Sequence, residues 1–351
     1  MIDVSFNNSI KTRNKNIALF IGAVTVLFAI LRIIVTRFYI DPYVHFYTDN
    51  ANWLVRSFDY ITALLVLVIF ISSAFIYRYN KDGYKYLSAS TSFVQGTQPE
   101  VFTSALSGFM LGFSAGYQIF SVFFKKDAFP DISPLAPLGE RLGSYIRQYP
   151  FDFIIFFVSI LCAIYFFKTA ATALNYDIGR DENYYARTYI NSDSDTPDTD
   201  GANGLNQGDS KDGDAKKNTE QPYAQFYIVL SFMPILWSFL NIFKCFFDMT
   251  KAVNSPVRIY ELMCFLALSA YFVSEARMLV GRHKISRFFT YAYLSVIFVA
   301  VSAVPSLTLS AFWILKNNNS QFLYGIEIAF ALYIAARIYS QIRYSKFILE
   351  R

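Results

Sequence analysis

The chain has 351 residues, and residues 104 to 116 read Ser104-Ala-Leu-Ser-Gly-Phe-Met-Leu-Gly-Phe-Ser-Ala-Gly116. This stretch lies inside an apolar run, Glu100–Phe124, that is long enough to cross a bilayer as one helix. Small residues recur in it at every fourth position, which predicts a helix face that another helix backbone approaches closely. A second run, Phe288–Leu315, repeats the pattern. We predict that helices pack through Ser104, Gly108, Gly112, Gly116, Ser302, Ser306 and Ser310.

The composition supports a membrane protein. Apolar residues make up 54% of the chain and the mean hydropathy is +0.33. Only 16% of the residues are charged, against about a quarter in soluble domains. The net charge of +5 is spread over many short loops, which argues against a nucleic-acid partner. The three cysteines form no CxxC pair, so we expect no disulfide, metal or cofactor.

Eight apolar runs are candidate membrane spans, which predicts an all-α, polytopic transmembrane helix bundle. The first run is not a signal peptide, because it continues past Arg32 to Tyr39 without a small-residue cleavage site. Most of the runs approach the roughly 20 apolar residues that a crossing helix needs. They are Ile17–Tyr39, Asp59–Tyr77, Glu100–Phe124, Phe151–Phe167, Ala224–Phe247, Tyr260–Ala276, Phe288–Leu315 and Phe322–Ile342.

The runs divide the chain into two halves of four spans. The expected parts are an N-terminal segment (1–16), a first half (17–167), a linker (168–223), a second half (224–342) and a C-terminal tail (343–351). Within the linker, residues 191–220 contain no aromatic residue and are predicted to be disordered. Acids and bases sixteen residues apart recur in both halves, which predicts two parallel repeats, as in several transporter folds.

The distribution of basic residues predicts the orientation. With the N-terminus inside, the inner segments carry 19 Lys and Arg residues and the outer segments carry 9. Cytoplasmic loops carry the excess of positive charge, so both termini are predicted to lie in the cytoplasm. We expect a multi-pass protein of the cell membrane.

Charged residues inside spans are candidates for function. Arg337 is expected to pair with Glu275 in the inner leaflet, and Arg32 with an acid near the outer side, unless both side chains reach water by snorkelling. The candidate substrate-binding residues are Arg32, Ser114, Gln118, Glu275 and Arg337. Four further acids lie near outer helix ends, where the helix dipole explains them better than a cation site does: Asp59, Asp152, Glu261 and Glu327.

Known catalytic patterns give little support for an enzyme. Gly112-Phe-Ser-Ala-Gly116 matches G-x-S-x-G, but that elbow needs a strand-to-helix turn and a nearby histidine. The sequence contains neither a phosphate-binding loop nor HExxH. His45 lies with Asp41 and Asp49 in the first outer loop, where an exposed polar loop explains them better than a metal site does.

Two functions remain after these exclusions. One is a transporter or carrier for a small solute. The other is a non-enzymatic membrane scaffold, sensor or partner subunit, working with a membrane protein partner or a second copy. A carrier requires a polar cavity that water reaches, whereas a scaffold requires a dry, packed centre.

Overall fold

The computed structural model describes residues 4–43, 45–78, 84–86, 97–124, 137–148, 150–175, 226–247, 254–279, 285–312, 321–344 and 347–349. The segment 191–220 and His283 lie outside the described residues. The described chain is helical apart from two short strands and the turns between elements, which confirms the all-α prediction.

Long helices account for every predicted span, and most extend a few residues beyond the apolar run that predicted them. Eight are long: α1 (Val4–Tyr39), α2 (Trp53–Arg78), α4 (Gln98–Phe124), α6 (Pro150–Asn175), α9 (Met233–Phe247), α10 (Pro256–Leu279), α11 (Ile285–Ala311) and α12 (Gln321–Tyr344). One helical turn at residues 226–231 directly precedes α9.

Seven of these segments are long and apolar enough to cross a membrane. They are Thr12–Tyr39, Trp53–Ser73, Pro150–Leu174, Phe226–Phe247, Pro256–Met278, Ser286–Ala311 and Gln321–Arg343. Helix α4 is not among the seven. Within its described first part, Glu100 and several Ser, Thr and Gly residues lower the hydropathy, although the helix has the length of its neighbours.

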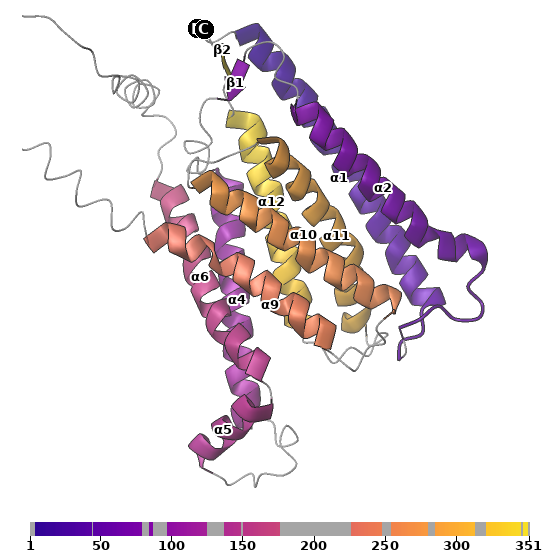
Figure 1. Ribbon diagram of the computed structural model, residues 1–351, viewed down its shortest axis with the longest axis vertical. Helices are drawn as coiled ribbons and strands as arrows, with labels where there is room; N and C mark the ends of the chain where they lie inside the picture. Colours follow the sequence, from indigo (N-terminus) through magenta and orange to yellow (C-terminus); the bar gives the residue numbers. More distant parts are fainter. Residues whose placement is uncertain are drawn as a thin grey trace, which may run out of the picture.

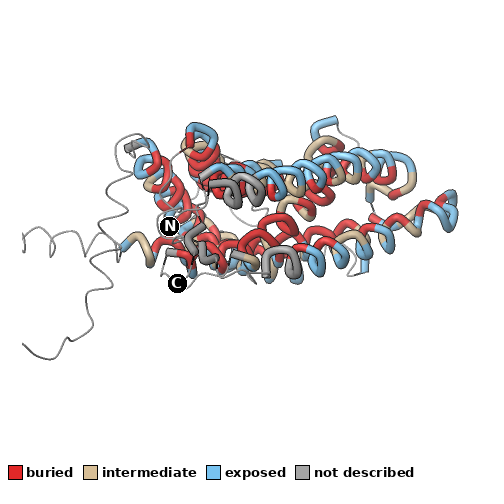
Figure 2. The backbone as a smooth tube through the Cα atoms, turned by 90° about the horizontal axis from the view of Figure 1, so that it is seen from above, coloured by how far each residue is buried: buried red, intermediate tan, exposed pale blue. Residues whose placement is uncertain are grey.

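The bundle is organised around α10, α11 and α12 (Figure 1). Helix α11 packs against α10, α12, α1 and α2, whereas α4 packs against α6 and α12, and α9 against α6 and α10. Between 56% and 61% of the apolar windows of α10, α11 and α12 are buried, against 22% for α1 and 17% for α2. Figure 2 shows the same division, with buried residues facing inward and exposed residues on the outer faces.

The predicted four-span repeat finds no support in the packing. Parallel repeats would make the pair α1 and α2 equivalent to the pair α9 and α10. Helices α9 and α10 pack closely, whereas α1 and α2 scarcely touch each other and both lie against α11. Similar charge spacing in the two halves therefore does not correspond to similar neighbours.

The small-residue face of α4 is shorter than predicted. A Cβ atom added at Gly108 would lie 3.2 Å from the Ala163 carbonyl oxygen and from the Phe167 ring, so α6 approaches closely there. Gly112 and Gly116 are exposed, and no atom lies within 4 Å of a Cβ added at either. The packing prediction is therefore wrong for these two glycines within this chain.

Helix geometry explains this correction. A helix turns by about 100° per residue, so a four-residue repeat drifts by about 40° at each step and leaves the interface. The buried residues of α4 follow spacings of three and four instead: Ser104, Ser107, Gly108, Leu111, Ser114 and Ala115. In α11 the three predicted serines, Ser302, Ser306 and Ser310, are all buried.

Two features of the fold were not predicted. Helix α5 (Leu138–Gln148) is a short amphipathic helix between α4 and α6, in a segment that belongs to none of the predicted spans. Strand β1 (Tyr84–Tyr86) pairs antiparallel with β2 (Phe347–Leu349), so the connection after α2 meets the C-terminal tail. These two strands lie at the end of the bundle opposite α5 (Figure 1).

Candidate functional site

The main polar site of the bundle is built on the first turn of α4. Thr97 caps this helix, because its hydroxyl oxygen accepts a hydrogen bond from the Glu100 N–H at 3.3 Å. Thr-x-x-Glu is the capping-box pattern, in which the glutamate usually turns back to the cap. Here Glu100 instead accepts a hydrogen bond from Ser340 of α12 at 2.9 Å. The Thr97 and Ser340 hydroxyls are also 2.8 Å apart.

Arg337 is the cation of this site. It lies on the same face of α12 as Tyr333 and Ser340, which are four residues before it and three after it. Its Nη1 atom donates to Glu100 Oε1, and its Nε atom lies 3.3 Å from Glu275 Oε1 on α10. The Arg337 side chain is completely buried, and both carboxylates are only 1% exposed.

Two phenols complete the environment of Glu275. Tyr333 donates to Glu275 Oε1 at 2.6 Å, and Tyr271, one turn before Glu275 on α10, donates to the same oxygen at 3.4 Å. Glu275 therefore has one charged neighbour and two neutral donors. We call Glu100, Glu275 and Arg337 the inner triad.

The inner triad is surrounded by aromatic side chains. The Phe166 ring of α6 lies 5.2 Å from Tyr333 and 5.1 Å from Phe330, measured between ring centroids. Tyr165 is also fully buried and stacks on Tyr227 at 5.4 Å. Removing an ion pair from water costs several kcal/mol per ion, so the close contacts within the triad are needed to offset that cost.

A second charged cluster lies near the opposite end of the bundle. Arg32 Nη1 donates to Asp59 Oδ1 at 3.0 Å, which is the pairing with an outer acid that the sequence suggested. Tyr47 donates to Asp59 Oδ2 at 2.8 Å, and Tyr260 donates to Oδ1 at 3.0 Å. The guanidinium also lies over the Tyr260 ring, 4.3 Å from its centroid. We call Arg32, Asp59, Tyr47 and Tyr260 the outer cluster.

Tyr47 belongs to the turn between α1 and α2. Burial, together with the adjacent Asp59, raises the pKa of its phenol from 10.0 to about 12, although Arg32 opposes this shift. The phenol is therefore a neutral hydrogen-bond donor over the whole physiological range.

Two of the remaining predicted outer acids are packed inside the bundle. Glu261 accepts from Tyr324 at 2.8 Å, and Glu327 lies 3.4 Å from Cys264 Sγ. Both glutamates are at most 2% exposed, so side chains of the bundle surround them in addition to the helix dipole. Asp152 pairs with Lys244 at 2.6 Å and is partly exposed.

The predicted site residues do not form one site. Arg337 and Glu275 meet, but Arg32 belongs to the outer cluster with different partners. Ser114 is buried in α4, fourteen residues or roughly 21 Å of helix from Glu100. Gln118 lies in α4, and its side chain is outside the described part of the structure.

Glu100 is the functional candidate that the sequence analysis missed. It was treated as the start of a span, without a partner. The Thr-x-x-Glu pattern marks it as the third residue of a helix, and Arg337 lies six residues before the basic end of α12. Both positions are therefore near the same end of the bundle, a signal that was present in the sequence.

Neither hydrolase nor metal chemistry gains support from the described residues. Ser114 sits within a continuous helix, not at a strand-to-helix turn. Among the residues that the structure describes, no three His, Cys, Asp or Glu side chains are grouped so that they could hold a metal ion. His45 is buried in the turn between α1 and α2, with a positive φ of 62°.

The chain matches no protein-family model, no curated protein and no solved structure. Its class therefore rests on its own features. Seven long apolar helices define a multi-pass helical membrane protein, with a buried charged triad at one end and a second charged cluster toward the other.

Proposed function

We propose that this protein is a non-enzymatic membrane scaffold, sensor or partner subunit, not a solute carrier. The observation that carries the proposal is the complete burial of Arg337 against Glu100 and Glu275. These are the charges that a polar substrate would need to reach. They are instead bonded to one another and enclosed by packed side chains.

The packing around the triad supports a dry centre. Among the residues that the structure describes, the largest side chains with less than 2% of their surface exposed are mostly aromatic rings from α6, α9, α10, α11 and α12. Trp237 illustrates the packing, because its ring meets Phe265 and Phe330 while its Nε1 donates to Ser159 at 3.1 Å. Such an arrangement fixes the helices relative to one another, which is what a scaffold requires.

An open cavity of the bundle lies apart from these charges. A cavity of about 610 Å³ is bounded by α1, α11 and α12, and neither Arg337 nor Arg32 is among its lining residues. The cavity is therefore separate from Arg337 and Arg32, the strongest candidate substrate-binding charges. A carrier for a polar solute would instead place such charges in the wall of its cavity.

One observation favours a second candidate, a proton-coupled carrier. The inner triad has two carboxyl groups and one guanidinium, so it carries a net charge of −1 when both acids are ionised. Burying an uncompensated charge is costly, and a proton on one carboxyl group would neutralise the site. Acids that bind protons inside membranes often belong to transport pathways.

Thiol accessibility tests the choice between scaffold and carrier. Cys162 and Cys264 are completely buried in α6 and α10. In a Cys245→Ser background, these two thiols report on the centre of the bundle. We expect a membrane-impermeant thiosulfonate, applied to both sides of permeabilised membranes, to modify neither thiol until the protein is unfolded in detergent. Intact-mass measurement counts the adducts.

An exposed cysteine provides the positive control. Asn52 is exposed at the start of α2, so the added thiol of Asn52→Cys should react fully in the same sample. Modification of Cys264 in the native protein would show that the centre opens to water. That result would contradict the scaffold proposal and favour the carrier.

A further inference from the structure

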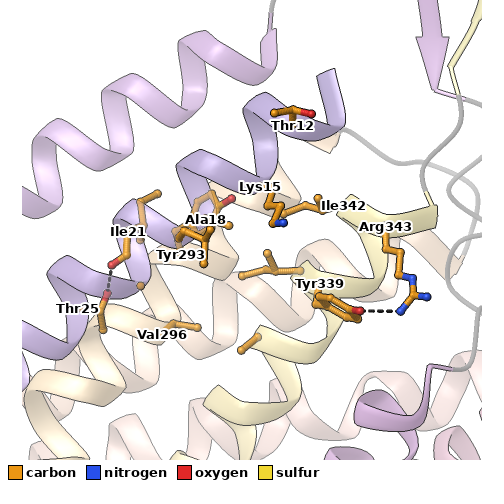
Figure 3. A pocket seen from close by; sticks show the side chains of 14 residues that line it. Thr12, Lys15, Ala18, Ile21, Thr25, Tyr293, Val296, Tyr339, Ile342 and Arg343 are labelled. Carbon is orange, nitrogen blue, oxygen red and sulfur yellow. Dashed lines mark hydrogen bonds between the residues drawn. The ribbon is translucent and has the colours of Figure 1, made fainter. Parts of the chain in front are cut away.

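A cavity of about 610 Å³ lies where α1 diverges from α12 (Figure 3). Helix α1 packs along α11 over much of its length but has few contacts with α12, so a space remains between them. The walls are mainly apolar and include Ala18, Ile21, Val296 and Ile338. A volume of this size lies within the range of small-molecule and cofactor sites, roughly 300–1,000 Å³.

The charged groups of this cavity have one sign. Lys15 and Arg343 lie among its fourteen lining residues, and none of those fourteen carries a carboxylate. Arg343 Nη1 donates to Tyr339 Oη at 2.7 Å, which holds the guanidinium beside the cavity. Both cations lie at ends of candidate membrane spans, because these spans begin at Thr12 and end at Arg343.

The depth of the cavity corresponds to about half a membrane. From Lys15 to Thr25, α1 rises by roughly 15 Å, and both residues line the cavity. The hydrocarbon core of a bilayer is about 30 Å thick, so one leaflet accounts for about 15 Å. The cations therefore lie at headgroup level, and the apolar walls extend along the depth that acyl chains of the same leaflet occupy.

We propose that this cavity is a binding site for an anionic phospholipid of that leaflet. Lys15 and Arg343 would bind the headgroup phosphate, and the apolar walls between α1 and α12 would take an acyl chain. Charge complementarity identifies this occupant. A neutral lipid could fill the apolar space, but an anionic headgroup also gains from the two cations in a lining whose fourteen described residues include no Asp or Glu.

Gly22 provides a way to close the site without disturbing the fold. It lines the cavity on α1, and no atom lies within 4 Å of a Cβ added there. A leucine at this position would extend into the space that the acyl chain is expected to occupy. Gly112 is the matched control, because it is also exposed with open space around it but lies outside the lining residues.

The test measures lipid adducts by native mass spectrometry. The full-length protein is equilibrated with equal amounts of phosphatidylglycerol and phosphatidylcholine. We expect the wild-type protein to retain the anionic lipid with a preference of roughly tenfold or more, because two basic residues near the membrane surface together favour the anionic headgroup. Lys15→Gln with Arg343→Gln should reduce this preference to about twofold or less, whereas Arg277→Gln, at an exposed basic residue outside the cavity, should preserve it.

Further measurements distinguish the phospholipid from other occupants of the cavity. Gly22→Leu should lower occupancy by both phospholipids, while Gly112→Leu should leave it unchanged. Oleate and glycerol 3-phosphate, added separately, should each fail to displace the bound phosphatidylglycerol. Displacement by oleate would assign the site to a free fatty acid, and displacement by glycerol 3-phosphate would assign it to a soluble phosphate. Either displacement, equal retention of the two phospholipids, or an unchanged preference in the Lys15 and Arg343 variant would overturn the proposal.

Discussion

Glu100 and Arg337 are separated by 237 residues in the sequence, yet they form a direct, fully buried ion pair between the start of α4 and the end of α12. Ser340, on the same face of α12, donates to the other Glu100 oxygen at 2.9 Å. Glu275 joins the site from α10, but it receives two hydrogen bonds from neutral phenols. The two carboxyl groups therefore have different roles.

The first prediction follows from that difference. Glu100→Gln should destabilise the protein by roughly 3–5 kcal/mol, because it removes the carboxylate that accepts directly from Arg337 and leaves that buried cation only its 3.3 Å contact with Glu275. Glu275→Gln should cost about 1 kcal/mol or less, because an amide oxygen still accepts from Tyr333 and Tyr271 and the triad keeps one anion and one cation. Thermal unfolding in detergent compares the two variants.

Arg337→Met provides the control for this prediction. Alone, it should be at least as damaging as Glu100→Gln, because it leaves two buried acids without their cation. The double variant Arg337→Met with Glu100→Met should recover much of the lost stability, since an apolar pair often replaces a buried ion pair well. Equal costs for Glu100→Gln and Glu275→Gln would show that both carboxylates are ionised and equally needed.

The second prediction concerns the outer cluster and pH. Tyr47→Phe removes the hydrogen bond to Asp59, so near neutral pH it should lower stability by roughly 1–2 kcal/mol. In the folded protein the pKa of this phenol is about 12, whereas the ordinary pKa of a tyrosine is 10.0. The stabilisation by Tyr47 is therefore complete below pH 10 and is lost as the pH rises toward 12.

The measurement is the melting temperature of the wild type and of Tyr47→Phe between pH 7 and pH 11.5. The difference between the two should shrink above pH 10. Tyr60→Phe, at a phenol that is 78% exposed, serves as the control and should change little. A difference that grows with pH would mean that Tyr47 ionises more easily in the folded state than in the unfolded chain.

The third prediction compares two glycines of one helix. Gly108→Leu should destabilise the protein by roughly 1–3 kcal/mol, because the new side chain meets the Ala163 carbonyl oxygen and the Phe167 ring. Gly112→Leu should stay within about 0.5 kcal/mol, because the space around it is open. Equal melting temperatures for the two variants would show that α4 and α6 are not in close contact at Gly108.

The fourth prediction concerns orientation. Asn50 lies between α1 and α2, and Gly139 lies in α5 between α4 and α6; both are exposed. With both termini in the cytoplasm and α4 as an eighth span, Asn50→Cys and Gly139→Cys should react with an impermeant maleimide in intact cells. Arg13→Cys should react only after permeabilisation. The reverse pattern would invert the orientation and place the cavity beside Lys15 in the outer leaflet.

The sequence predicts the helices well because apolar length is a local property. The charge pairs and the glycine face that it suggested fare differently, for identifiable reasons. Arg337 meets Glu275, and Arg32 meets Asp59, because a charge within a span is stabilised by an opposite charge at a similar depth. The glycine face fails beyond Gly108, because a strict four-residue repeat does not match a helix of 3.6 residues per turn.

The remaining features depend on which helices become neighbours. The sequence places Glu100 and Arg337 near the same end of the bundle, but no local pattern indicates that α4 packs against α12, so depth alone does not select Glu100 as the main partner of Arg337. The same holds for the cavity, which exists because α1 follows α11 and diverges from α12. Equivalent charge spacing in the two halves predicted a repeat, yet the packing of α1 and α2 differs from that of α9 and α10.

The pairing of Glu100 with Arg337 also constrains how the protein is made. At about 5–20 residues per second, the ribosome needs roughly ten to fifty seconds to translate the 237 positions between them. During that interval α4 and then α10 are synthesised carrying acids whose cation has not yet been made. The nascent bundle can therefore complete its interior only when its last helix arrives. A chain that terminates before α12 would leave both acids without their cation, a defect by which quality-control proteases can distinguish unfinished copies from finished ones.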